Sequence, residues 1–574
     1  MKNSLVSQIL SELADYTELE DEQPYRARAY RRAAQVIESL QEDIEDVARE
    51  GRLQELPGVG ENIEKKIQEI LRTGKLEALE KLKQRIPVDV NSLIRVEGIG
   101  PKTAKLLYER LKIRNLDDLE SAVKEGKLQN IKGLGIKSQK LLLERIEAAR
   151  ARSNRILLVQ AQEIAERVSK ELSEISSVKN FAIAGSFRRY KETVGDFDVL
   201  VLSDNPEQFM ADFTKWNEVN EVILSGEQKT SVKIENNFQI DVRVVRENSW
   251  GAALLYFTGS KPHNIELRTL AIKKGLRLNE YGLFTSEGKQ VAGATEEGIY
   301  SYLGLDFILP ELRENRGEIQ CAQNHTLPKP IDLGEIKGDL QMHTNWSDGT
   351  ADIQSMAEKA RALGYEYIAI TDHAGSLKIA NALDSERIRN QSKEIERLNE
   401  KFEKEGFGLH ILHGAEVNIK SDGTMDLPNA ELKQFDLVLG SIHSGFGDDK
   451  DKMTRRVLSA MDNEHVDVIA HPTGRILLER SSYSLDFQKV IEKSLETDTI
   501  LEMDVHPNRF DLSDEMAYQA IKSRCKISVD TDSHSPRELE YMKIGISQAR
   551  RAWAEKKDVL NTLSYKELLR FIGK

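Results

Sequence analysis

Cysteine is almost absent from the chain, with Cys321 and Cys525 the only two in 574 residues. Two cysteines so far apart in sequence provide neither a disulfide framework nor a cysteine-based zinc site. No apolar run approaches the ~20 residues of a membrane span, and the N-terminus MKNSLVSQIL lacks a signal-peptide pattern. We therefore expect a protein of the reducing cytoplasm that has no membrane partner.

Basic residues are also in deficit, because 82 Lys and Arg face 95 Asp and Glu and give a formal net charge of −13. This total argues mildly against nucleic-acid binding, but acids gathered at metal sites lower the total without describing any one surface. Apolar residues make up 39% of the chain, enough for ordinary cores. The length predicts roughly three to five domains.

Two carboxylates within one strand-like run are the strongest chemical signal. Asp196 and Asp198 lie two residues apart in GDFDVLVL, so they share one face of the predicted strand. A second apolar run, residues 238–245 (FQIDVRVV), carries Asp241. Three carboxylates from neighbouring strands can hold two hard cations, the arrangement used for in-line displacement at phosphorus. Solvated acids on an exposed strand face are the alternative for a lone D-x-D.

The turn before this pair favours phosphate chemistry. Gly185 and Ser186 follow an apolar run, and such a turn exposes backbone N–H groups to a phosphate. Arg188 and Arg189 come next, and one of them can fork onto a triphosphate. The combination resembles the nucleotidyltransferase fold, and GSFRR with GDFDVL resembles the palm of family X DNA polymerases.

The N-terminal part reads as helical, with a repeated glycine pattern. LPGVG at residues 56–60 precedes the amphipathic Ile63, Ile67 and Ile70, which describes a helix–hairpin–helix whose backbone N–H groups reach a DNA phosphate. The pattern recurs as VEGIGPK at 96–102 and, more loosely, as IKGLGIK at 131–137. Glycine turns that merely join helices explain this recurrence poorly. The predicted contacts ignore base sequence. The candidate DNA-binding residues here are Gly58, Gly60, Gly98, Gly100 and Lys102.

The stretch LPGVGENIEKKI resembles the small N-terminal domain of DNA polymerase beta and its relatives. The resemblance places Lys66 at the position of a lysine that forms a Schiff base with the sugar left after base loss, with Tyr30 in support. Asn62 and Arg26 stand where the relatives carry lysines. A solvated lysine on a helix face is the alternative.

The resemblance also implies a nucleotide pocket after the third acid. YFTGS at residues 256–260 would contact the sugar and base of an incoming nucleotide, and Arg268 would contact DNA. Tyr190 replaces a usual Gly, and Gln239 sits where an Arg often precedes the third Asp. The implied nucleotide-binding residues are Gly185, Ser186, Arg189, Gly195, Tyr256, Phe257, Gly259 and Asn264.

From residue 338 onward, histidines and acids stand at the ends of short apolar runs that alternate with helical patterns. This alternation describes an α/β barrel whose metal site lies at the carboxyl ends of its strands. This C-terminal part of the chain resembles the polymerase-and-histidinol-phosphatase (PHP) domain, a distorted barrel that binds up to three divalent ions. That likeness implies three ligand groups: His343, Glu416 and Asp532; Glu416, His443 and His471; and Asp348, His373 and His534. The family's opening His-x-His is Gln341-Met342-His343 here, so Gln341 is a further candidate ligand.

The predicted fold is therefore multidomain: helical helix–hairpin–helix domains, an α+β nucleotidyltransferase palm and a C-terminal distorted α/β barrel. The expected divisions are residues 1–90 (lyase-like helical domain), 91–155 (second helical domain), 156–247 (palm), 248–317 (thumb-like subdomain), 318–335 (linker) and 336–574 (PHP domain).

The whole pattern resembles bacterial and archaeal family X DNA polymerases and implies a gap-filling repair enzyme with a 3′-to-5′ exonuclease and an activity at abasic sites. The implied cofactors are Mg²⁺ or Mn²⁺ in the palm and Mn²⁺ or Zn²⁺ in the PHP domain. The implied partners are gapped or nicked double-stranded DNA and deoxynucleoside triphosphates, with the chain a monomer. The alternatives are a small-molecule PHP phosphatase and a DNA-binding protein with one lapsed site.

Overall fold

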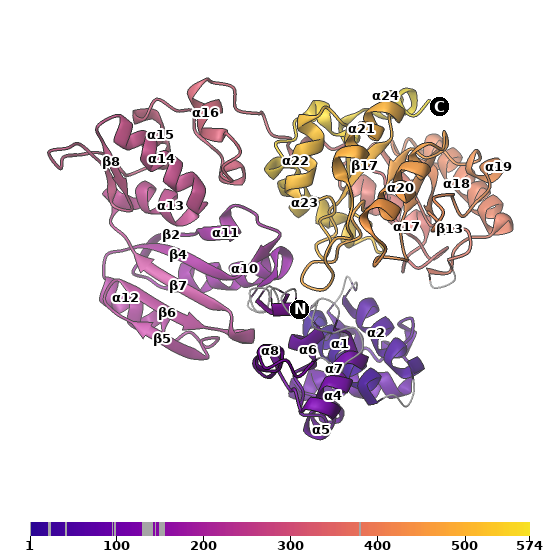
Figure 1. Cartoon of the computed structure of the whole chain (residues 1–574), viewed down its shortest axis with the longest axis horizontal. Coiled ribbons are helices and arrows are strands. Elements are labelled where there is room, and N and C mark those ends of the chain that lie inside the picture. The colour runs from indigo at the N-terminus through magenta and orange to yellow at the C-terminus, as the bar shows by residue number, and fades with distance from the viewer. Residues whose placement is uncertain are drawn as a thin grey trace.

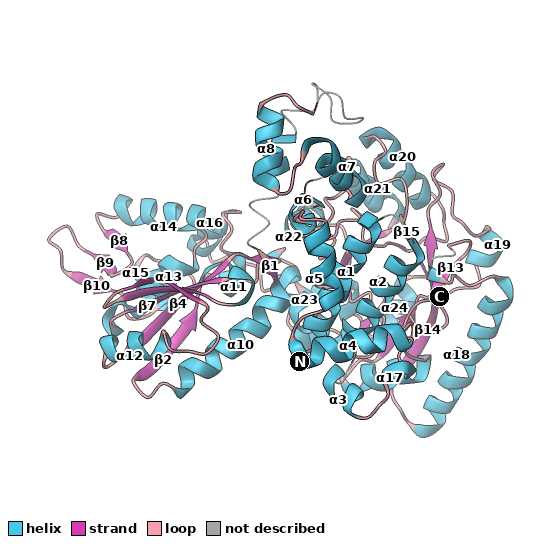
Figure 2. Cartoon of the chain, turned by 90° about the horizontal axis from the view of Figure 1, so that it is seen from below, coloured by secondary structure: helices cyan, strands magenta, loops and turns pink. Residues whose placement is uncertain are grey.

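The computed structural model of the chain arranges a helical N-terminal part, a palm sheet, a thumb and a barrel in sequence order (Figure 1). It describes residues 2–573 except 21–23, 39, 41–42, 95, 97–98, 129–141, 144, 148–154 and 378–379. Figure 2 shows the palm and thumb on one side and the barrel with the N-terminal helices on the other. No helix within these described stretches is both long and apolar enough to cross a membrane.

Helices of the N-terminal part share one apolar core. Ile63, Ile67 and Ile70 repeat at helical spacing and are buried, which fixes the inner face of their helix. Gly60 and Gly100 precede two of these helices with nearly the same extended backbone, so both hairpins open in the same way. The helices are α1 (Asn3–Glu20), α2 (Pro24–Glu38), α3 (Ile44–Arg49), α4 (Glu61–Thr73), α5 (Glu77–Arg85), α6 (Val90–Ile94), α7 (Pro101–Leu111) and α8 (Leu116–Lys124).

The palm is a five-stranded sheet in the order β2-β4-β7-β6-β5. Its central strands β4 and β7 run parallel, and Asp198 pairs with Asp241 in their register. Phe197 and Ile240 alternate with these acids and are buried in the palm core, so the acids project from the other face. The palm elements are β1 (Ile156–Leu157), α10 (Leu158–Glu174), β2 (Val178–Ile183), α11 (Gly185–Arg188), β3 (Thr193–Val194), β4 (Asp196–Ser203), α12 (Pro206–Phe213), β5 (Glu221–Ser225), β6 (Lys229–Lys233) and β7 (Gln239–Val244).

The thumb combines helices with a three-stranded antiparallel sheet. Its elements are α13 (Trp250–Thr258), α14 (Lys261–Lys273), β8 (Arg277–Asn279), β9 (Gly282–Phe284), β10 (Gln290–Ala292), α15 (Glu296–Tyr302) and α16 (Glu318–Gln323). The last of these occupies the start of the expected linker. Its Ile319 and Ala322 are buried in the thumb core, and Glu318 lies 2.7 Å from the buried His263 ring. A helix of six residues is too short to show a period in sequence, so tertiary contacts decide it.

The barrel contains parallel strands in the order β11-β12-β14-β15-β16-β17-β18, with β13 paired beside β14. A bridge between Met342 and Ser533 joins its first and last segments, which nearly closes the barrel. The predicted fold class, including this barrel, is confirmed. The strands are β11 (Gly338–Asp339), β12 (Tyr367–Ile370), β13 (His373–Ala374), β14 (His410–Asn418), β15 (Leu437–Ser441), β16 (Val468–Ile469), β17 (Ile500–Asp504) and β18 (Ile527–Asp530). The helices are α17 (Ile353–Ala362), α18 (Ser385–Glu405), α19 (Asn429–Leu432), α20 (Lys450–Met461), α21 (Phe487–Thr497), α22 (Asp514–Lys522), α23 (Met542–Arg551) and α24 (Tyr565–Phe571).

A buried ion network joins the palm, thumb and barrel. Arg551 of α23 is fully buried and pairs with Asp514 at 2.6 Å and with Glu314 of the thumb at 3.0 Å. It also donates to the Arg189 carbonyl oxygen of the palm at 2.6 Å. Arg316 pairs with the same Asp514 at 3.1 Å. The barrel is thus packed against the turn that leads into the palm carboxylates.

We expect Arg551→Met to lower the thermal unfolding midpoint by roughly 10 °C, because it leaves two buried carboxylates without this partner. Differential scanning calorimetry measures the shift. Lys543→Met on the same helix removes only an exposed ion pair with Glu540, of 3.1 Å, and should change the midpoint by less than about 2 °C. Equal shifts in the two variants would contradict a stabilising role for the buried network.

Candidate functional site

The palm carboxylates converge on one face of the sheet. Because β4 and β7 are parallel and in register, Asp198 lies directly beside Asp241, and Asp196 pairs with Gln239. Gln239, the departure from the usual Arg, donates to Asp241 Oδ1 at 2.8 Å. Lys229 of β6 lies 3.2 Å from the other oxygen of Asp241. The face therefore presents three acids, with Lys229 at its edge and Arg243 two residues after Asp241 on the same side.

The pKa values of the three palm carboxylates reflect their burial and their mutual repulsion. Burial, followed by the charges of Asp196 and Asp241, raises the pKa of Asp198 to about 6. Burial and the charge of Asp241 also raise the pKa of Asp196. Burial opposes ionisation of Asp241, but hydrogen bonds from Gln239, Ser231 and Lys229 leave its pKa lowered. A divalent cation would relieve the repulsion in this group, so its donor chemistry fits a hard cation.

We expect binding of Mn²⁺ to the palm to weaken by about tenfold between pH 7.5 and pH 5. Asp198 is ionised above its raised pKa of about 6 and mostly protonated at pH 5, and a protonated carboxyl competes poorly for a cation. Titration with Mn²⁺ in a Glu416→Gln background, which weakens the barrel site, measures the palm affinity. Asp198→Asn should bind weakly at both pH values; an unchanged pH slope in that variant would assign the effect to another group.

The turn predicted to bind phosphate is the N-terminal turn of a short helix. Gly185 begins α11 with φ +67°, and a Cβ there would lie 3.3 Å from Asp198 Oδ2, so glycine allows the turn to approach the acid. Tyr190, which replaces the usual Gly, also has a positive φ of 53°. Ser186 follows Gly185 in α11, and Gly195 precedes Asp196 with a Cβ position 3.3 Å from Arg155.

Both predicted arginines join the palm to the thumb. Arg189 pairs with Glu314 at 2.9 Å and donates to the Thr258 carbonyl oxygen, while Arg188 pairs with Glu296 at 2.6 Å. In this arrangement the Arg189 guanidinium is held by the thumb. Its triphosphate contact stays a prediction.

The predicted nucleotide pocket lies at the junction of α13 and α14. Tyr256 is 39% exposed and meets Phe257 edge to face, with ring centroids 5.1 Å apart. Asn264 donates to the Tyr256 carbonyl oxygen at 2.7 Å, and Arg268 donates to the Asn264 carbonyl oxygen at 3.2 Å. Gly259 has φ +70° and a Cβ position 3.1 Å from Arg189, so a larger residue would displace that arginine. The segment thus connects the aromatic pair with the turn arginine.

The structure describes part of the hairpins that are predicted to bind DNA. Gly58 has φ +82° and packs against Arg32, while Gly60 and Gly100 precede the first turns of α4 and α7. Gly98, the side chain of Lys102 and the loose third hairpin lie outside the described residues. Open backbone N–H groups at two helix starts are available to phosphates.

The lyase candidate Lys66 is on α4. Its Nζ lies 5.8 Å from the centre of the Tyr30 ring and donates to the Asn62 carbonyl oxygen at 3.3 Å. Asn62 stands on the same helix one turn earlier. The structure brings the two predicted residues together, and the Schiff-base role stays a prediction.

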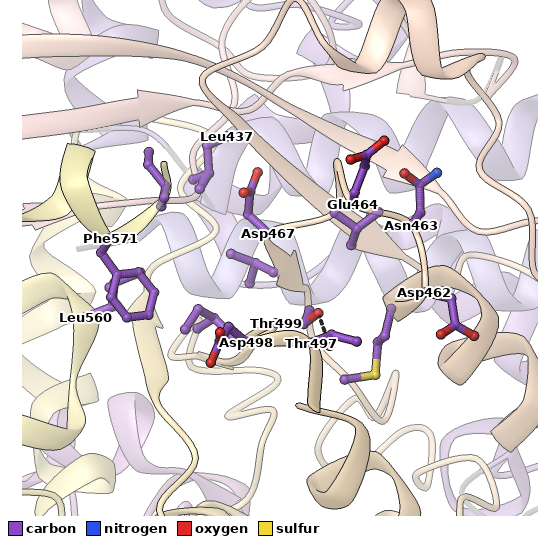
Figure 3. Close-up of a pocket in the computed structure, with 15 residues that line it drawn as sticks. Leu437, Asp462, Asn463, Glu464, Asp467, Thr497, Asp498, Thr499, Leu560 and Phe571 are labelled. Atoms are coloured by element: carbon purple, nitrogen blue, oxygen red, sulfur yellow. Dashed lines mark hydrogen bonds between the residues drawn. The ribbon is translucent and has the colours of Figure 1, made fainter. Parts of the chain in front are cut away.

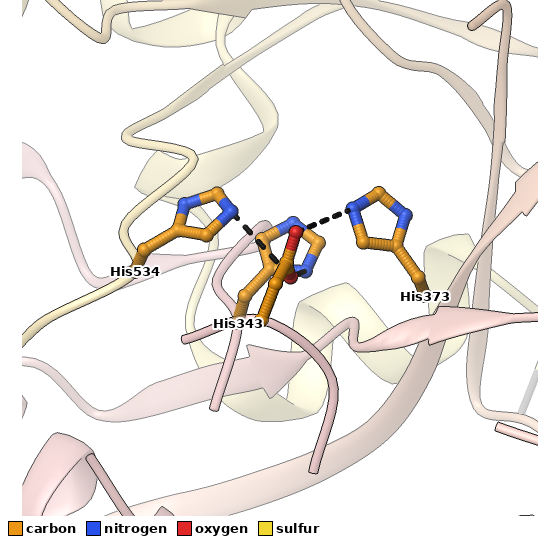
Figure 4. Close-up of side chains that lie close together, drawn as sticks. His343, His373 and His534 are labelled. Atoms are coloured by element: carbon orange, nitrogen blue, oxygen red, sulfur yellow. Dashed lines mark ion pairs between the residues drawn. The ribbon is translucent and has the colours of Figure 1, made fainter. Parts of the chain in front are cut away.

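The barrel gathers its predicted ligands at the carboxyl ends of the strands. Figure 4 shows the His343, His373 and His534 rings around one carboxylate, which belongs to Asp348. The shortest nitrogen–oxygen distances from these rings to Asp348 are 3.9, 3.6 and 3.7 Å. Burial and the His343 ring oppose protonation of His534, but Asp348 and Asp532 raise its pKa to about 9.

Glu416 is the centre of the other two groups. Its Oε1 lies 3.2 Å from His443 and 3.1 Å from His471, and its Oε2 lies 3.3 Å from His343. Asp532 lies 3.1 Å from the same nitrogen of His343, Nε2, that faces Glu416. Burial raises the pKa of Glu416, but the surrounding histidines lower it further, so the carboxylate is ionised. The structure therefore brings all the predicted barrel ligands together.

Gln341 belongs to the same cluster. In one orientation of its side-chain amide, the nitrogen lies 3.3 Å from Glu416 and 3.4 Å from Asp532, and the oxygen faces the Glu502 carboxylate. The opposite orientation donates the amide N–H to Glu502 instead and directs the oxygen to Glu416 and Asp532. Three oxygens then face one point beside His343. This favours Gln341 as an oxygen ligand.

The residues present fit divalent cations. Both ring nitrogens of His343 are buried without a hydrogen bond, and buried polar atoms normally have partners. Ligand atoms lie within 4.8 Å of one another in three groups: His343, Asp348, His373 and His534; His373, Glu416 and His443; and His343, Glu416 and Asp532. The second group contains His373 where His471 was expected, although His471 also lies 3.1 Å from Glu416. Mixed imidazole and carboxylate donors suit Mn²⁺ and Zn²⁺. The barrel site therefore has the ligand set of a multinuclear metal centre.

Sequence reasoning missed Glu502. This fully buried acid of β17 accepts from the His471 backbone N–H at 2.6 Å, and burial with Asp504 and Asp530 raises its pKa well above its usual value. This hydrogen bond holds the backbone of His471, which is a predicted metal ligand. Its signal was present, because ILEMD is an apolar run that ends in acids, like the neighbouring strands.

The cavity in Figure 3 lies at the opposite end of the barrel, where β15, β16 and β17 begin. It measures about 350 Å³ and is lined by residues such as Asp467, Asp498 and Phe571. None of the predicted site residues lines it. The predicted metal ligands therefore lie at one end of the barrel, and this cavity lies at the other end.

Family models match the chain in the order that the fold shows. They are a helix-hairpin-helix domain at residues 1–76, a SAM-like helix-hairpin-helix tandem at 90–148, a DNA polymerase beta palm at 155–242, a DNA polymerase beta thumb at 253–314 and a PHP domain at 339–498. The fold and site together define a polymerase of the DNA polymerase beta class joined to a PHP domain.

Relatives specify the family. The chain is 36% identical to the DNA polymerase/3'-5' exonuclease PolX of Bacillus subtilis over 99% of this chain and 98% of that protein. It belongs to the family X DNA polymerases that carry a PHP domain. DNA polymerase lambda of Arabidopsis thaliana is 30% identical over 50% of this chain and 58% of its own length. A probable phosphatase of Thermoanaerobacter sp. is 28% identical over 39% of this chain and 90% of its own length.

Proposed function

We propose that the protein is a DNA repair polymerase whose PHP domain is a 3′-to-5′ exonuclease. The single observation that carries this is the presence of two separate acid-rich metal-binding geometries in one chain that also holds two hairpins for DNA. Similarity to PolX over nearly the whole chain supports the same function. Its substrates are DNA and deoxynucleotides, and both sites use divalent metal ions.

In the palm, Asp196, Asp198 and Asp241 would hold two Mg²⁺ or Mn²⁺ ions, whose chemistry would be to lower the pKa of the primer hydroxyl and neutralise charge on the triphosphate. The turn at Gly185 and Ser186 offers backbone N–H groups to the phosphates. Tyr256 and Phe257 bind the sugar and base, and Asn264 contacts the base. The 3′ oxygen attacks the α-phosphorus, the bond to the bridging oxygen breaks, and pyrophosphate leaves.

In the barrel, the histidines and carboxylates would hold up to three Mn²⁺ or Zn²⁺ ions, whose chemistry would be to activate water and neutralise charge on the phosphodiester. The two oxygens of Glu416 lie within 3.5 Å of four histidine rings and orient them. Glu502 fixes the position of His471 through the backbone N–H. Addition of water across the terminal P–O3′ bond leaves a 3′-hydroxyl on the strand and releases a nucleoside 5′-monophosphate.

Finer assignments belong to the same proposal. The two hairpins favour gapped or nicked DNA, on which base excision repair depends. A monomer suffices, because one chain contains both sites. Lyase chemistry at Lys66 and cleavage at abasic sites follow from the family resemblance.

A gel assay tests the function. A labelled primer in a one-nucleotide gap with a downstream 5′-phosphate is incubated with Mn²⁺, with and without deoxynucleotides. We expect growth by one nucleotide when nucleotides are present and shortening when they are absent. Tight gap binding with neither change would support the DNA-binding protein with lapsed sites. Fast hydrolysis of histidinol phosphate without DNA products would support the small-molecule phosphatase.

A further inference from the structure

Two arginines that no site above uses lie on the segments that follow β16 and β17 at the carboxyl ends of the barrel strands. Arg509 follows β17, and its Nε is 3.4 Å from Asp504 and 3.6 Å from Asp532, a predicted ligand. Arg480 lies in the segment that follows His471. In that segment Leu477 donates its backbone N–H to the carbonyl oxygen of Asn508 at 2.6 Å, so the segments that carry Arg480 and Arg509 pack side by side. Burial and the positive charge of Arg509 lower the pKa of Arg480, which agrees with this packing.

Arg480 is held flat against an aromatic ring. Its guanidinium carbon lies 4.0 Å from the centre of the Phe446 ring, and its Nε donates to the Gly474 carbonyl oxygen at 2.8 Å. Phe446 in turn stacks beside Tyr483, with centroids 6.3 Å apart. A Cβ at Gly474 would lie 2.8 Å from Tyr483 and 3.1 Å from Phe446, so glycine is required for this packing. The guanidinium orientation is therefore fixed before any ligand binds.

The remaining donors of both arginines are free to bind. Among the described residues, no hydrogen bond engages Nη1 or Nη2 of Arg480 or of Arg509. Glu479 and Asp511 are the acids that act on Arg480, and Asp511 already accepts from Thr473 at 2.8 Å. Two neighbouring cations with unused forks form a cradle for a phosphate, which accepts from several N–H groups at once.

The segment with Arg480 also reaches the palm. Arg475 pairs with Glu192 of the palm at 2.7 Å and donates to the carbonyl oxygen of Phe510, the residue after Arg509. Phe446 lies three residues beyond His443, and Arg480 lies nine beyond His471. The cradle is thus built by the loops that carry predicted ligands, on the side of the barrel that contacts the palm.

We propose that Arg480, stacked on Phe446, and Arg509 form a subsite for the phosphodiester next to the scissile one in a DNA strand. This inference rests on the proposed exonuclease. At a 3′ end the scissile phosphate joins the last two nucleosides, and no phosphate follows the last one. The phosphate next to the scissile one is therefore on the 5′ side of the penultimate nucleoside. Phe446 is half-buried beside Arg480, and its aromatic ring suits the base of that nucleotide.

Two dinucleotides test the subsite in the full chain. Thymidylyl-thymidine with a 5′-phosphate (pTpT) has the neighbouring phosphate, TpT lacks it, and both are too short to span the hairpins and the barrel. We expect the KM for pTpT to be about tenfold below that for TpT, with similar kcat. In Arg480→Met this ratio should fall to about one, and Arg480→Lys should keep an intermediate ratio because it keeps charge but not the fork.

A matched arginine provides the control. Arg361 lies 4.1 Å from the centre of the Phe407 ring near the start of β12, at the end of the barrel away from the ligands. Arg361→Met should leave the KM ratio unchanged. A ratio of one in the unmodified chain, a ratio that persists in Arg480→Met, or an equal loss of kcat on both dinucleotides would overturn the subsite. If the chain also fails to shorten the gap primer, the exonuclease proposal itself is wrong. If it shortens the primer but has equal KM values for pTpT and TpT, only the subsite proposal is wrong.

Discussion

Asp198→Asn is expected to reduce primer extension by about 10³-fold or more and to leave primer shortening unchanged. Asp198 lies between Asp196 and Asp241, and its oxygen is 3.3 Å from the Cβ position of Gly185, so it faces both the cations and the phosphate turn. Asparagine preserves the shape but removes the charge that binds cations. Single-turnover extension of the gap primer measures the loss.

Asp204→Asn is the matched control for this change. Asp204 directly follows β4, is 71% exposed in its side chain and pairs with Lys179 at 2.6 Å. Loss of that exposed pair should alter extension by less than about twofold. If Asp198→Asn extends primers at a rate close to that of the unmodified chain, Asp198 is not a palm ligand and the assignment of the acids is wrong.

Glu416→Gln should have the opposite effect, with shortening reduced by about 10³-fold or more and extension retained. One carboxylate lies within 3.5 Å of four histidines, so neutralising it removes the charge common to two of the three ligand groups. Metal analysis of the purified protein by mass spectrometry should show fewer equivalents of bound Mn²⁺ or Zn²⁺. That readout does not depend on activity.

Glu400→Gln on α18 provides the comparison for this variant, because Glu400 is exposed and pairs with Lys404 at 3.5 Å. It should change neither metal content nor shortening. Full metal content in Glu416→Gln would contradict the central position of Glu416. Loss of extension as well as shortening would instead indicate that the variant disturbs the contact between the barrel and the palm.

Much of the architecture was predictable because its signals are local. The spacing of Asp196 and Asp198 in an apolar run determines their common face, and the strand ends before His373, Glu416 and His443 identify the barrel rim. The glycines of residues 56–60 predict the hairpin from the sequence alone. Contacts such as Arg551 with Asp514 and Glu314 had no such signal, because an arginine in sequence is equally compatible with an exposed helix face.

The sequence by itself determined the order of the domains, the fold class and the residues that form the two groups predicted to bind metal ions, since periodicity and motif spacing are properties of short segments. Only the tertiary structure decided that Arg189 is held by Glu314, that Glu502 stands behind His471 and that Arg480 lies on Phe446 beside Arg509. These pairs are separated by at least 29 residues, and their contacts depend on how packed loops from different strands meet. Side-chain partners across such distances are selected by burial and charge in the folded chain, which no local pattern records.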